Sequence, residues 1–593
     1  MIRTPLRPLA RILQARARGE NPDAIERENI RRRHEEMRKR ARRRAEGRLL
    51  VLGVLFFAGF VTVGGRMAGL ASSEPSEPRA AAAGAQINAT RADIVDRKGR
   101  VLATNLDTYS LYAQPRDMVD PKRAAVELAR IFPDLDRARL EKDFTGKRTF
   151  VWIRKQLSPE QKQAVHDIGE PGLLFGPREM RLYPNGRLAA HVLGGASFGR
   201  EGVHAAEVVG VAGVEKFFDK RLRDPARAHE PLTLSLDLSA QDALERVLEG
   251  GMSLMNARGA AAVLMDVRTG EVIALASLPD FDPNDRPRPQ VSGPAAQSPL
   301  FNRAVQGVYE LGSVFKIFAV AQAMDLGQVT PATQIDTSGP LKWGKFTIRD
   351  FHNYGARMTA RQVIVKSSNI GAARIAQKIG ADRQRAFLGK LGLLEPAQLE
   401  LVEAASVHPL LPANWSELST MTIAYGHGLS VSPLQLAAAY ATIANGGRRV
   451  TPTLLRRAQV PEGPRVMKKE AAAAALSMLR GVVTEGTASL GEVAGYRVAG
   501  KTGTADKPNP QGGYYEDKVI ATFASIFPSD DPRYALVVTL DEPVETSGRE
   551  PRRTAGWTAV PVAAEIIRRV APLLGLRPAI EPVDPGAITL TSD

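Results

Sequence analysis

Three short groups of serine, lysine and threonine residues have the types and spacings that acyl transfer requires. The first is Ser313-Val-Phe-Lys316, which opens an apolar run that ends at Gly327. Such a run followed by glycine predicts a buried helix. Residues three apart share a helix face, so the Lys316 amine should lie beside the Ser313 hydroxyl. A lysine buried among apolar residues can have its pKa lowered enough to act as the base that activates a serine.

The second group is Ser367-Ser-Asn369, which interrupts a helical pattern between residues 359–366 and 370–379. Polar side chains within an apolar helical sequence need hydrogen-bond partners if they are buried. We interpret Ser367 as a second hydroxyl that relays a proton. We interpret Asn369 as an amide that orients Lys316 and the peptide group of a substrate.

The third group is Lys501-Thr502-Gly503-Thr504, which is predicted to lie on a strand. Gly503 would let a substrate backbone lie close along that strand, while Lys501 and the two threonine hydroxyls can bind a carboxylate. The amide N–H of Thr504, paired with that of Ser313, would form an oxyanion hole for acyl transfer.

Each group, taken alone, also fits a structural explanation: a serine at a helix start, a solvated turn between helices, or the basic start of a strand. Their occurrence together, in this order, favours an enzyme. A further pattern, Gly195-Ala-Ser-Phe-Gly199, matches the nucleophile elbow of α/β-hydrolases but lacks the helix that should follow the serine. The eight histidines contain no His-Glu-x-x-His pattern, which disfavours a metallopeptidase.

The elements that must hold these groups in place come in two sets separated by a long helix-rich insert. A helix is predicted over residues 239–250, with Ser239 as its cap. The order of the strands predicts one antiparallel sheet, built from both ends of a domain over residues 232–575, with helices packed on it. The predicted strands are residues 233–238, 259–265, 271–277, 496–505, 519–527 and 534–540.

Composition excludes several classes of protein. The 593 residues include no cysteine, which excludes a disulfide scaffold, a zinc–thiolate site and a cysteine nucleophile. A hydrophobic fraction of 44% excludes a mostly disordered chain. The net charge of +16 could indicate nucleic-acid binding, but residues 1–48 alone hold sixteen Lys+Arg and seven Asp+Glu. More than half of the excess therefore lies on a short tail, and we expect no nucleic-acid partner.

Residues 49–71 are predicted to form a transmembrane helix. Residues 49–65 are uncharged and mostly apolar, and Arg66 can extend its charge towards the interface. Positive charge before a first apolar segment keeps that side in the cytoplasm, so residues 1–48 are predicted as a basic cytoplasmic tail. The alternative is a cleaved signal peptide, but 48 preceding residues are far too many for one.

The remaining segments are a linker, a second domain and a tail. Residues 72–86 are rich in Ser, Glu, Pro and Ala, which predicts a linker. Residues 87–231 are interpreted as a modest α+β pedestal in which no catalytic residue can be identified, and residues 576–593 as a C-terminal tail. The pedestal is predicted to have strands at residues 93–95, 100–103 and 109–113 and helices at residues 121–131 and 159–168.

Ser-x-x-Lys, Ser-x-Asn and Lys-Thr-Gly-Thr are together the signatures of the penicillin-binding proteins, and residues 87–575 resemble the class B members of that family. Residues 309–316, the compact pedestal and the segment at Tyr425 are most similar to the septal members. The stretches that carry the resemblance beyond the signatures are residues 91–103, 181–184, 191–194, 210–215, 266–274 and 425–435.

The resemblance implies a membrane-anchored, multidomain α+β protein with a β-lactamase-like transpeptidase domain and an N-terminal, dimerisation-like pedestal. It implies a peptidoglycan D,D-transpeptidase in which Ser313 attacks the penultimate D-Ala of a stem peptide, and a neighbouring stem's amine then resolves the acyl-enzyme. The site residues implied are catalytic Ser313, Lys316, Ser367, Asn369 and Lys501, with Thr502, Gly503 and Thr504 for substrate binding.

The resemblance also implies a setting. The substrates would be stem peptides and lipid-linked nascent glycan, β-lactams would acylate Ser313, and neither a metal nor an organic cofactor would be needed. The partners would be the membrane glycosyltransferase FtsW and other divisome proteins, at the inner membrane, with the catalytic domain periplasmic. The alternatives are an elongation-type class B transpeptidase, a D,D-carboxypeptidase or β-lactamase, and a non-catalytic division scaffold.

Overall fold

The computed structural model describes residues 7–20, 22–72, 91–201, 206–509 and 511–579. The chain divides into two compact units, residues 1–77 and 78–593. Nearly all of the predicted linker and most of the predicted C-terminal tail lie outside the described residues. The predicted domain limits therefore remain predictions.

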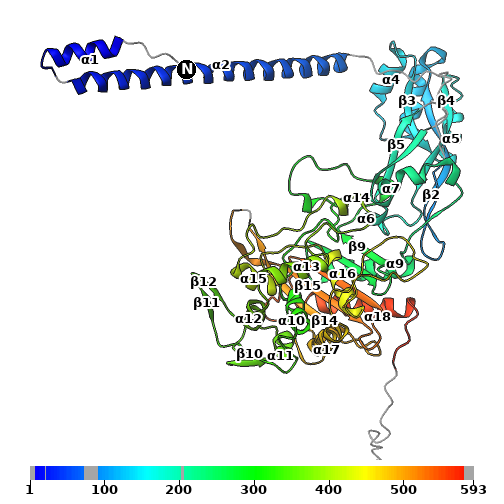
Figure 1. The fold of residues 1–593 in the computed structure, drawn as a ribbon. Coiled ribbons are helices and arrows are strands. Elements are labelled where there is room, and N and C mark those ends of the chain that lie inside the picture. The colour runs from blue at the N-terminus through cyan, green and yellow to red at the C-terminus, as the bar shows by residue number, and fades with distance from the viewer. Residues whose placement is uncertain (1–6, 21, 73–90, 202–205, 510, 580–593) are drawn as a thin grey trace, which may run out of the picture. The chain divides into compact units, whose positions relative to one another are not determined.

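The first unit consists of helices α1 (Arg7–Ala17) and α2 (Pro22–Ser72), drawn in blue in Figure 1. Helix α2 is continuous over 51 residues, so the basic and the apolar stretch belong to one helix. Its segment Glu46–Ala68 has a mean hydropathy of 2.0 over its apolar window, and none of that window is buried. Twenty-three helical residues extend about 35 Å, enough to cross a hydrocarbon core of about 30 Å.

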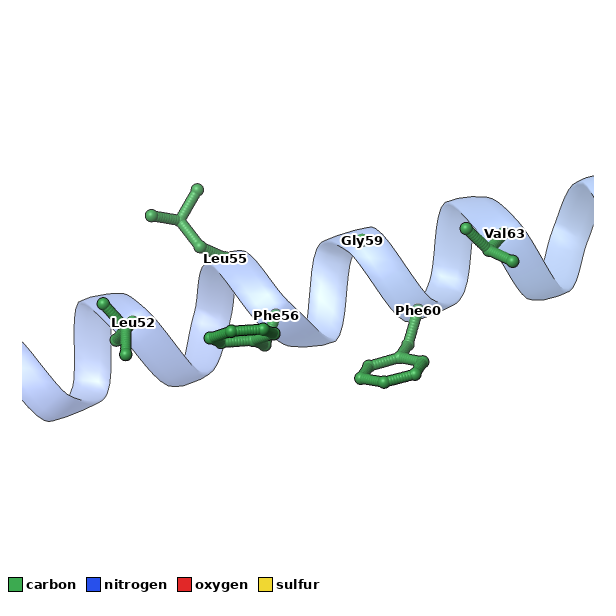
Figure 2. Close-up of a pocket in the computed structure, with 6 residues that line it drawn as sticks. All are labelled: Leu52, Leu55, Phe56, Gly59, Phe60 and Val63. Atoms are coloured by element: carbon green, nitrogen blue, oxygen red, sulfur yellow. The ribbon is translucent and has the colours of Figure 1, made fainter. Parts of the chain in front are cut away.

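Large apolar side chains project from this segment of α2. Figure 2 shows Phe56 and Phe60 on one side of the helix and Leu55 pointing away from them. Phe56 is 63% exposed and Phe60 is 74% exposed. Apolar side chains all round a helix fit lipid surroundings, so α2 suits the membrane anchor that was predicted over residues 49–71.

The N-terminal part of the second unit is built around the long strand β2 (Val101–Ala113). One edge of β2 pairs with β4 (Leu173–Leu182) and the other with β3 (Val151–Leu157), while its first residues pair with β1 (Ile94–Val95). The two strands predicted at residues 100–103 and 109–113 are therefore one strand, because pairing with β4 also keeps the polar stretch between them extended.

Helices α3 (Pro121–Ile131), α4 (Arg137–Thr145) and α5 (Pro159–His166) pack on this sheet around buried Leu111, Leu128 and Phe132. The Asp120 carboxylate accepts a bond from the Arg123 N–H and so caps α3, and Ser158 caps α5 in the same way. The following segments are α6 (Ala190–Leu193), β5 (Gly195–Glu201), β6 (Ala206–Ala212), α7 (Gly213–Phe217) and α8 (Asp219–Leu222). The Gly-x-Ser-x-Gly pattern lies within strand β5, not between a strand and a helix.

A buried ionic cluster joins the segment that precedes β1 to β4, α7 and α8. The Arg91 guanidinium donates to Glu215 at 2.7 Å and to Asp219 at 2.8 Å, and Arg181 donates to the other Glu215 oxygen at 2.7 Å. The side chains of Arg91 and Glu215 are 1% and 0% exposed. Two guanidinium groups on one carboxylate offset the cost of removing its charge from water.

The C-terminal part of the second unit contains a five-stranded antiparallel sheet in the order β14–β15–β16–β8–β9, which confirms the predicted sheet. Strand β14, which carries the third motif, is at its edge. The strands are β8 (Gly259–Asp266), β9 (Val272–Leu278), β14 (Ala499–Pro508), β15 (Tyr514–Phe527) and β16 (Tyr534–Asp541).

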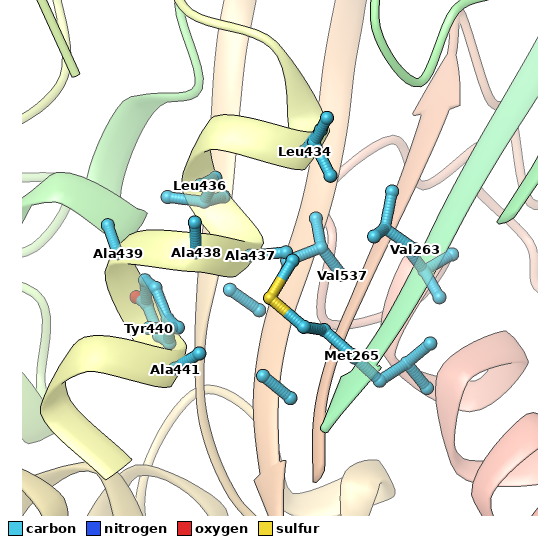
Figure 3. Close-up of a cluster of buried hydrophobic side chains, with 14 of the residues drawn as sticks. Val263, Met265, Leu434, Leu436, Ala437, Ala438, Ala439, Tyr440, Ala441 and Val537 are labelled. Carbon is cyan, nitrogen blue, oxygen red and sulfur yellow. The ribbon is translucent and has the colours of Figure 1, made fainter. Parts of the chain in front are cut away.

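Helices cover both faces of this sheet. All residues of β8 except Asp266 are buried although successive side chains point to opposite faces. Helix α16 (Pro433–Ala444) packs against Val263, Met265 and Val537, as Figure 3 shows. Helices α9 (Leu238–Leu254) and α18 (Ala559–Leu573) pack on each other and on the sheet.

The start of this domain differs from the prediction. Helix α9 begins at Leu238, and its cap is Asp237, whose carboxylate accepts the N–H of Ser239 at 3.0 Å. The predicted strand at residues 233–238 is only the two-residue β7 (Leu232–Thr233). Beyond it, Ser235 donates its N–H to Leu454 instead of continuing the ladder with β1.

The insert between β9 and β14 supplies most of the site. Its principal helices are α10 (Lys316–Asp325), α11 (Ala360–Val365), α12 (Asn369–Ile379), α13 (Ala381–Lys390), α15 (Glu417–Ala424) and α17 (Lys469–Glu485). Its short strands are β10 (Gln334–Asp336), β11 (Leu341–Trp343), β12 (Phe346–Ile348) and β13 (Arg357–Thr359).

Candidate active site

Ser313 lies in a tight 3-10 turn, Gly312–Phe315, that leads directly into α10. The regular helix therefore starts three residues later than the serine. Gly312 has φ +62° and donates its N–H to Gly426 at 3.2 Å, while Tyr440 donates its hydroxyl to the Val314 carbonyl at 2.8 Å. A Cβ on Gly312 would come within 2.7 Å of the Thr504 oxygen, so this position requires glycine. The turn is thus held on two sides, and its serine is half-buried.

Lys316 is completely buried at the start of α10. Its Nζ donates to the Ser367 carbonyl at 2.6 Å and lies 3.1 Å from the Ser367 hydroxyl. Among the described residues, no hydrogen bond joins Lys316 to Ser313, and the hydrogen bonds of Lys316 go to the second motif. Burial, and then the positive charge of Lys501, lower the pKa of Lys316 well below its usual value. A neutral amine at this position can accept a proton.

Ser367 connects the two buried lysines. Its hydroxyl oxygen accepts a hydrogen bond from Lys501 Nζ at 3.0 Å, as well as contacting Lys316. It separates α11 from α12, as predicted, and has φ +65°, a left-handed conformation that is rare for a residue with a side chain. Burial lowers the pKa of Lys501 to about 7. Three sequence-predicted residues from three elements therefore form one hydrogen-bonded group.

Strand β14 lies against the Ser313 turn. A Cβ on Gly503 would come within 2.1 Å of the Leu311 carbonyl oxygen. The predicted role of this glycine was to admit a substrate backbone, whereas the atom that faces it is part of the protein. The close approach places the Thr504 backbone beside Gly312, so the two N–H groups predicted for the oxyanion hole belong to adjacent segments.

The threonine hydroxyls of β14 have protein partners. Thr502 Oγ1 lies 2.6 Å from Thr487 Oγ1, and Thr504 Oγ1 accepts the Ala555 N–H at 3.0 Å. Because Thr504 acts as an acceptor there, its own proton can be donated elsewhere. These contacts fix the hydroxyls along the edge strand beside Lys501.

Asn369 does not touch Lys316 through any hydrogen bond among the described residues. Its side-chain amide donates to the Arg349 carbonyl at 2.8 Å, and its backbone N–H donates to Asp350 at 2.5 Å. Sequence reasoning missed Asp350. The contact could not be read from spacing, because Asp350 lies in a loop outside the helical pattern of the motif.

A second group that sequence reasoning missed surrounds Glu310. Its carboxylate accepts the Gly428 N–H at 2.7 Å and the Tyr514 hydroxyl at 3.0 Å, and lies 3.1 Å from His427 Nδ1. The hydrogen bonds from His427 and Gly428 outweigh the desolvation and hold the pKa of Glu310 below its usual value. Two loops and the start of β15 therefore meet just ahead of Ser313.

Comparisons with known proteins agree with this geometry. Residues 260–568 match the family described as the penicillin binding protein transpeptidase domain, and residues 86–226 match the penicillin-binding protein dimerisation domain. The second match supports the interpretation of this region as a dimerisation-like pedestal.

Named relatives cover most of the chain. The probable peptidoglycan D,D-transpeptidase FtsI of Caulobacter vibrioides is 35% identical over 555 residues, which are 92% of this chain and 91% of that protein. The peptidoglycan D,D-transpeptidase FtsI of Escherichia coli K12 is 29% identical over 83% of this chain and 85% of that protein. The predicted resemblance to septal class B proteins is confirmed by these relatives.

A solved structure shares the fold. The crystal structure of penicillin binding protein 3 from Mycobacterium tuberculosis, complexed with aztreonam, has a TM-score of 0.63 and 27% identity, and it covers 83% of this chain and 98% of that chain. The predicted fold class is confirmed. With a family match over more than half of its length and a 35% identical relative that it covers almost entirely, the chain belongs to the penicillin-binding protein transpeptidase family.

Proposed function

We propose that this chain is a peptidoglycan D,D-transpeptidase that cross-links stem peptides through an acyl-enzyme on Ser313, during synthesis of the division septum. One observation carries the proposal. The Ser367 hydroxyl lies between Lys316 Nζ and Lys501 Nζ, at 3.1 and 3.0 Å, and both lysines are buried beside the turn that holds Ser313. This arrangement provides a base and a proton relay in one hydrogen-bonded group, beside the turn that carries the nucleophile.

Acylation would begin with proton transfer from Ser313 to the neutral amine of Lys316, at the end of the same short turn. The Ser313 oxygen attacks the carbonyl carbon of the penultimate D-Ala. The bond to the terminal D-Ala then breaks, and the leaving amine takes a proton returned from Lys316 through the Ser367 hydroxyl. The N–H groups of Ser313 and Thr504 would bind the carbonyl oxygen as it becomes negative.

Cross-linking would reverse the proton movements. A side-chain amine of a neighbouring stem attacks the ester carbon on Ser313 and gives its proton to Lys316. The ester bond breaks, Ser313 recovers a proton and an amide bond joins the two stems. If water attacks the ester instead, a stem-peptide acyl-enzyme releases a shortened stem, as in a D,D-carboxypeptidase. A β-lactam acyl-enzyme then releases the ring-opened β-lactam, as in a β-lactamase.

The terminal carboxylate of the substrate would lie along β14. Lys501 supplies a cation when protonated, and Thr502 and Thr504 supply hydroxyls on the same edge strand. A β-lactam carries an anionic group near its reactive carbonyl, which in a penicillin is a carboxylate, and would acylate Ser313 in the same way. The solved relative was complexed with the β-lactam aztreonam, which supports this assignment.

The proposed membrane setting rests on α2. The helix carries most of its basic residues before an exposed apolar segment, which by the positive-inside rule supports a cytoplasmic N-terminus and a periplasmic catalytic domain. The substrate's lipid-linked form and the glycosyltransferase FtsW would both be reached from the inner membrane. The names of the FtsI relatives support a place among the divisome proteins.

The test uses the full chain in detergent with labelled penicillin. A covalent adduct is expected on the wild type and no adduct on Ser313→Ala. Ser197→Ala, which changes the serine of the Gly-x-Ser-x-Gly pattern, is the matched control and should be labelled fully. Absence of wild-type labelling, or labelling that survives Ser313→Ala, would contradict the proposal.

The remaining alternatives separate in other measurements. Incubation with stem-peptide substrate gives cross-linked dimers from a transpeptidase and only shortened monomers from a carboxypeptidase. A fluorescent fusion at midcell supports the septal role, and lateral patches support an elongation role. A division scaffold without catalysis predicts that Ser313→Ala sustains cell division.

A further inference from the structure

The loop after β12 contacts the second motif from outside its helices. Strands β11 and β12 form a small hairpin at the margin of the domain, labelled in Figure 1, and the chain then returns through Arg349 and Asp350. The Arg349 carbonyl receives the Asn369 side chain, as described above. Asp350 makes the other contacts of this loop with the motif.

The half-buried Asp350 carboxylate accepts three hydrogen bonds from consecutive residues. Its Oδ2 receives the Ser368 hydroxyl at 2.7 Å, and its Oδ1 receives the N–H groups of Asn369 at 2.5 Å and Ile370 at 3.0 Å. The two amides are the first of α12 and have no carbonyl partner within the helix. A carboxylate at this point matches both the free N–H groups and the positive end of the helix dipole.

These bonds fix the residue that precedes them. Ser367 has φ +65°, a conformation that costs about 1–3 kcal/mol for a residue with a side chain and persists only where its surroundings hold it. On its N-terminal side Ser367 donates its N–H to Ile364 at 3.3 Å, and on its C-terminal side Ser368 is buried and bonded to Asp350. This conformation turns the Ser367 carbonyl and hydroxyl towards Lys316 Nζ.

We propose that Asp350 is a positioning residue for the acyl-transfer reaction, which holds Ser367 in the conformation that presents its carbonyl and hydroxyl to Lys316 and places a negative charge near that lysine. The inference deepens the proposed function and rests on it. Asp350 acts through Ser367, Ser368 and Asn369, and it does not itself touch the reacting atoms.

The electrostatics of the site support the second half of this role. The charged groups that act on Lys316 are Lys501, from β14, and Asp350, from the loop after β12. Burial and Lys501 lower the pKa of Lys316, and Asp350 opposes them by raising it. Removal of the Asp350 charge should therefore increase the fraction of neutral Lys316 at low pH.

The experiment measures the second-order rate constant of acylation by labelled penicillin across a pH series, using the full chain in detergent. Asp350→Ala removes all three hydrogen bonds. Asp350→Asn retains an oxygen for the two N–H groups but removes the charge. Asp336→Asn is the matched control, because Asp336 lies in the same insert and accepts the Ser338 N–H at 2.9 Å without contacting the motif.

We expect Asp350→Ala to acylate at least about tenfold more slowly, since a shift of about 1 Å in a reacting group can cost about a hundredfold. Asp350→Asn should be slowed less, and the acid limb of its pH profile should move to lower pH. Asp336→Asn should match the wild type. Circular dichroism and thermal unfolding establish whether each variant is folded. If Asp350→Ala does not fold, Asp350→Asn alone still tests the inference.

Two results would overturn the inference. One is a folded Asp350→Ala whose rate stays within about twofold of the wild type. The other is an Asp350→Asn variant whose acid limb does not move. Its slower acylation would then be explained by a weakened start of α12, without any effect of the Asp350 charge on Lys316. Both differ from failure of the proposed function, in which the wild type itself is not acylated.

Discussion

The hydroxyl of Tyr514 donates to the carboxylate of Glu310 at 3.0 Å, and this bond joins the start of β15 to the residue three positions before Ser313. The hairpin that carries the third motif is therefore tied to the loop that carries the first. His427 and Gly428 hold the same carboxylate from a third loop. The rim of the site is thus one hydrogen-bonded assembly, formed around an anion.

Tyr514→Phe should slow acylation without unfolding the protein. A hydrogen bond to a charged group contributes about 1.5–3 kcal/mol, and less at the half-exposed rim, so we expect a loss of about three- to tenfold in the acylation rate constant. Tyr515→Phe is the control, because its ring contacts Lys518 and not Glu310. Equal rates for the two variants would show that the bond to Glu310 does not matter for catalysis.

The pH dependence of acylation should be bell-shaped. The acylation rate constant rises with pH as Lys316 becomes neutral, which occurs well below the usual pKa of a lysine. It falls as Lys501 loses its proton, since burial lowers the pKa of Lys501 to about 7 and the neutral amine no longer attracts the substrate carboxylate. The two lysines share Ser367, so the profile reports the pair rather than either residue alone. In Lys501→Arg, which stays charged, the falling limb should disappear; its persistence near pH 7 would rule out this assignment.

Lys501→Met should raise the stability of the second unit at neutral pH while abolishing acylation. An amine whose pKa is lowered by burial binds its proton more weakly in the folded than in the unfolded chain, so it disfavours folding below its unfolded pKa of 10.5. This penalty is complete below about pH 7 and is relieved as the pH rises towards 10.5. Thermal unfolding at about pH 6, below this window, and at about pH 10, near its upper end, should show a gain of about 1 kcal/mol or more only at the lower pH. An equal gain at both values would contradict this account.

Gly503→Ala should impair both folding and acylation. The added methyl would lie 2.1 Å from the Leu311 carbonyl oxygen, so β14 would have to move away from the Ser313 turn. We expect a loss of about 1–3 kcal/mol in the free energy of unfolding. Gly250→Ala in α9 is the control, since nothing lies within 4 Å of its Cβ and alanine favours a helix by about 0.5–1 kcal/mol. A Gly503→Ala protein as stable and as active as the wild type would show that β14 is not packed as described.

Arg91→Ala should strongly destabilise the pedestal. Removal of one partner from a buried ion pair costs about 3–5 kcal/mol, and here it leaves the buried Glu215 carboxylate with Arg181 as its one remaining guanidinium partner. Arg246→Ala provides the comparison, because Arg246 pairs with Asp242 on the surface and such pairs contribute about 0–1 kcal/mol. Chemical unfolding of both variants measures the difference, and similar midpoints would mean that Glu215 finds other partners.

The central sheet could be predicted from the sequence because its strands are apolar runs bounded by turn residues. The hairpin of β8 and β9, with its Val267-Arg-Thr-Gly270 turn, is the clearest case. Strand β2 was divided in the prediction because its middle residues are polar, and only pairing with β4 holds them extended. The local sequence pattern predicts a strand well where burial alone determines its extent. It predicts a strand poorly where pairing with a distant strand determines its extent.

The site shows the same division. The three motifs identified the residues that meet, and their spacing located the break between α11 and α12. It could not reveal that Lys316 bonds to Ser367 rather than to Ser313, since that contact depends on a left-handed residue far along the chain. Asp350 lies in none of the stretches that carry the family resemblance, and Glu310, although it lies within residues 309–316, belongs to none of the three motifs. Their contributions come from carboxylates that satisfy backbone N–H groups, which only the folded arrangement displays.

The unbroken course of α2 has a consequence for the basic residues that precede the apolar segment. In a flexible tail all of these charges could settle on the lipid surface, whereas a helix holds each at a fixed height. Arg31 lies seventeen residues before Arg48 on the same helix, which places it about 25 Å further along the axis. That height is about three times the Debye length of about 8 Å at physiological salt. Only the basic turns nearest the apolar segment therefore lie close enough to act on lipid headgroups, and the charge further along the helix is held away from them.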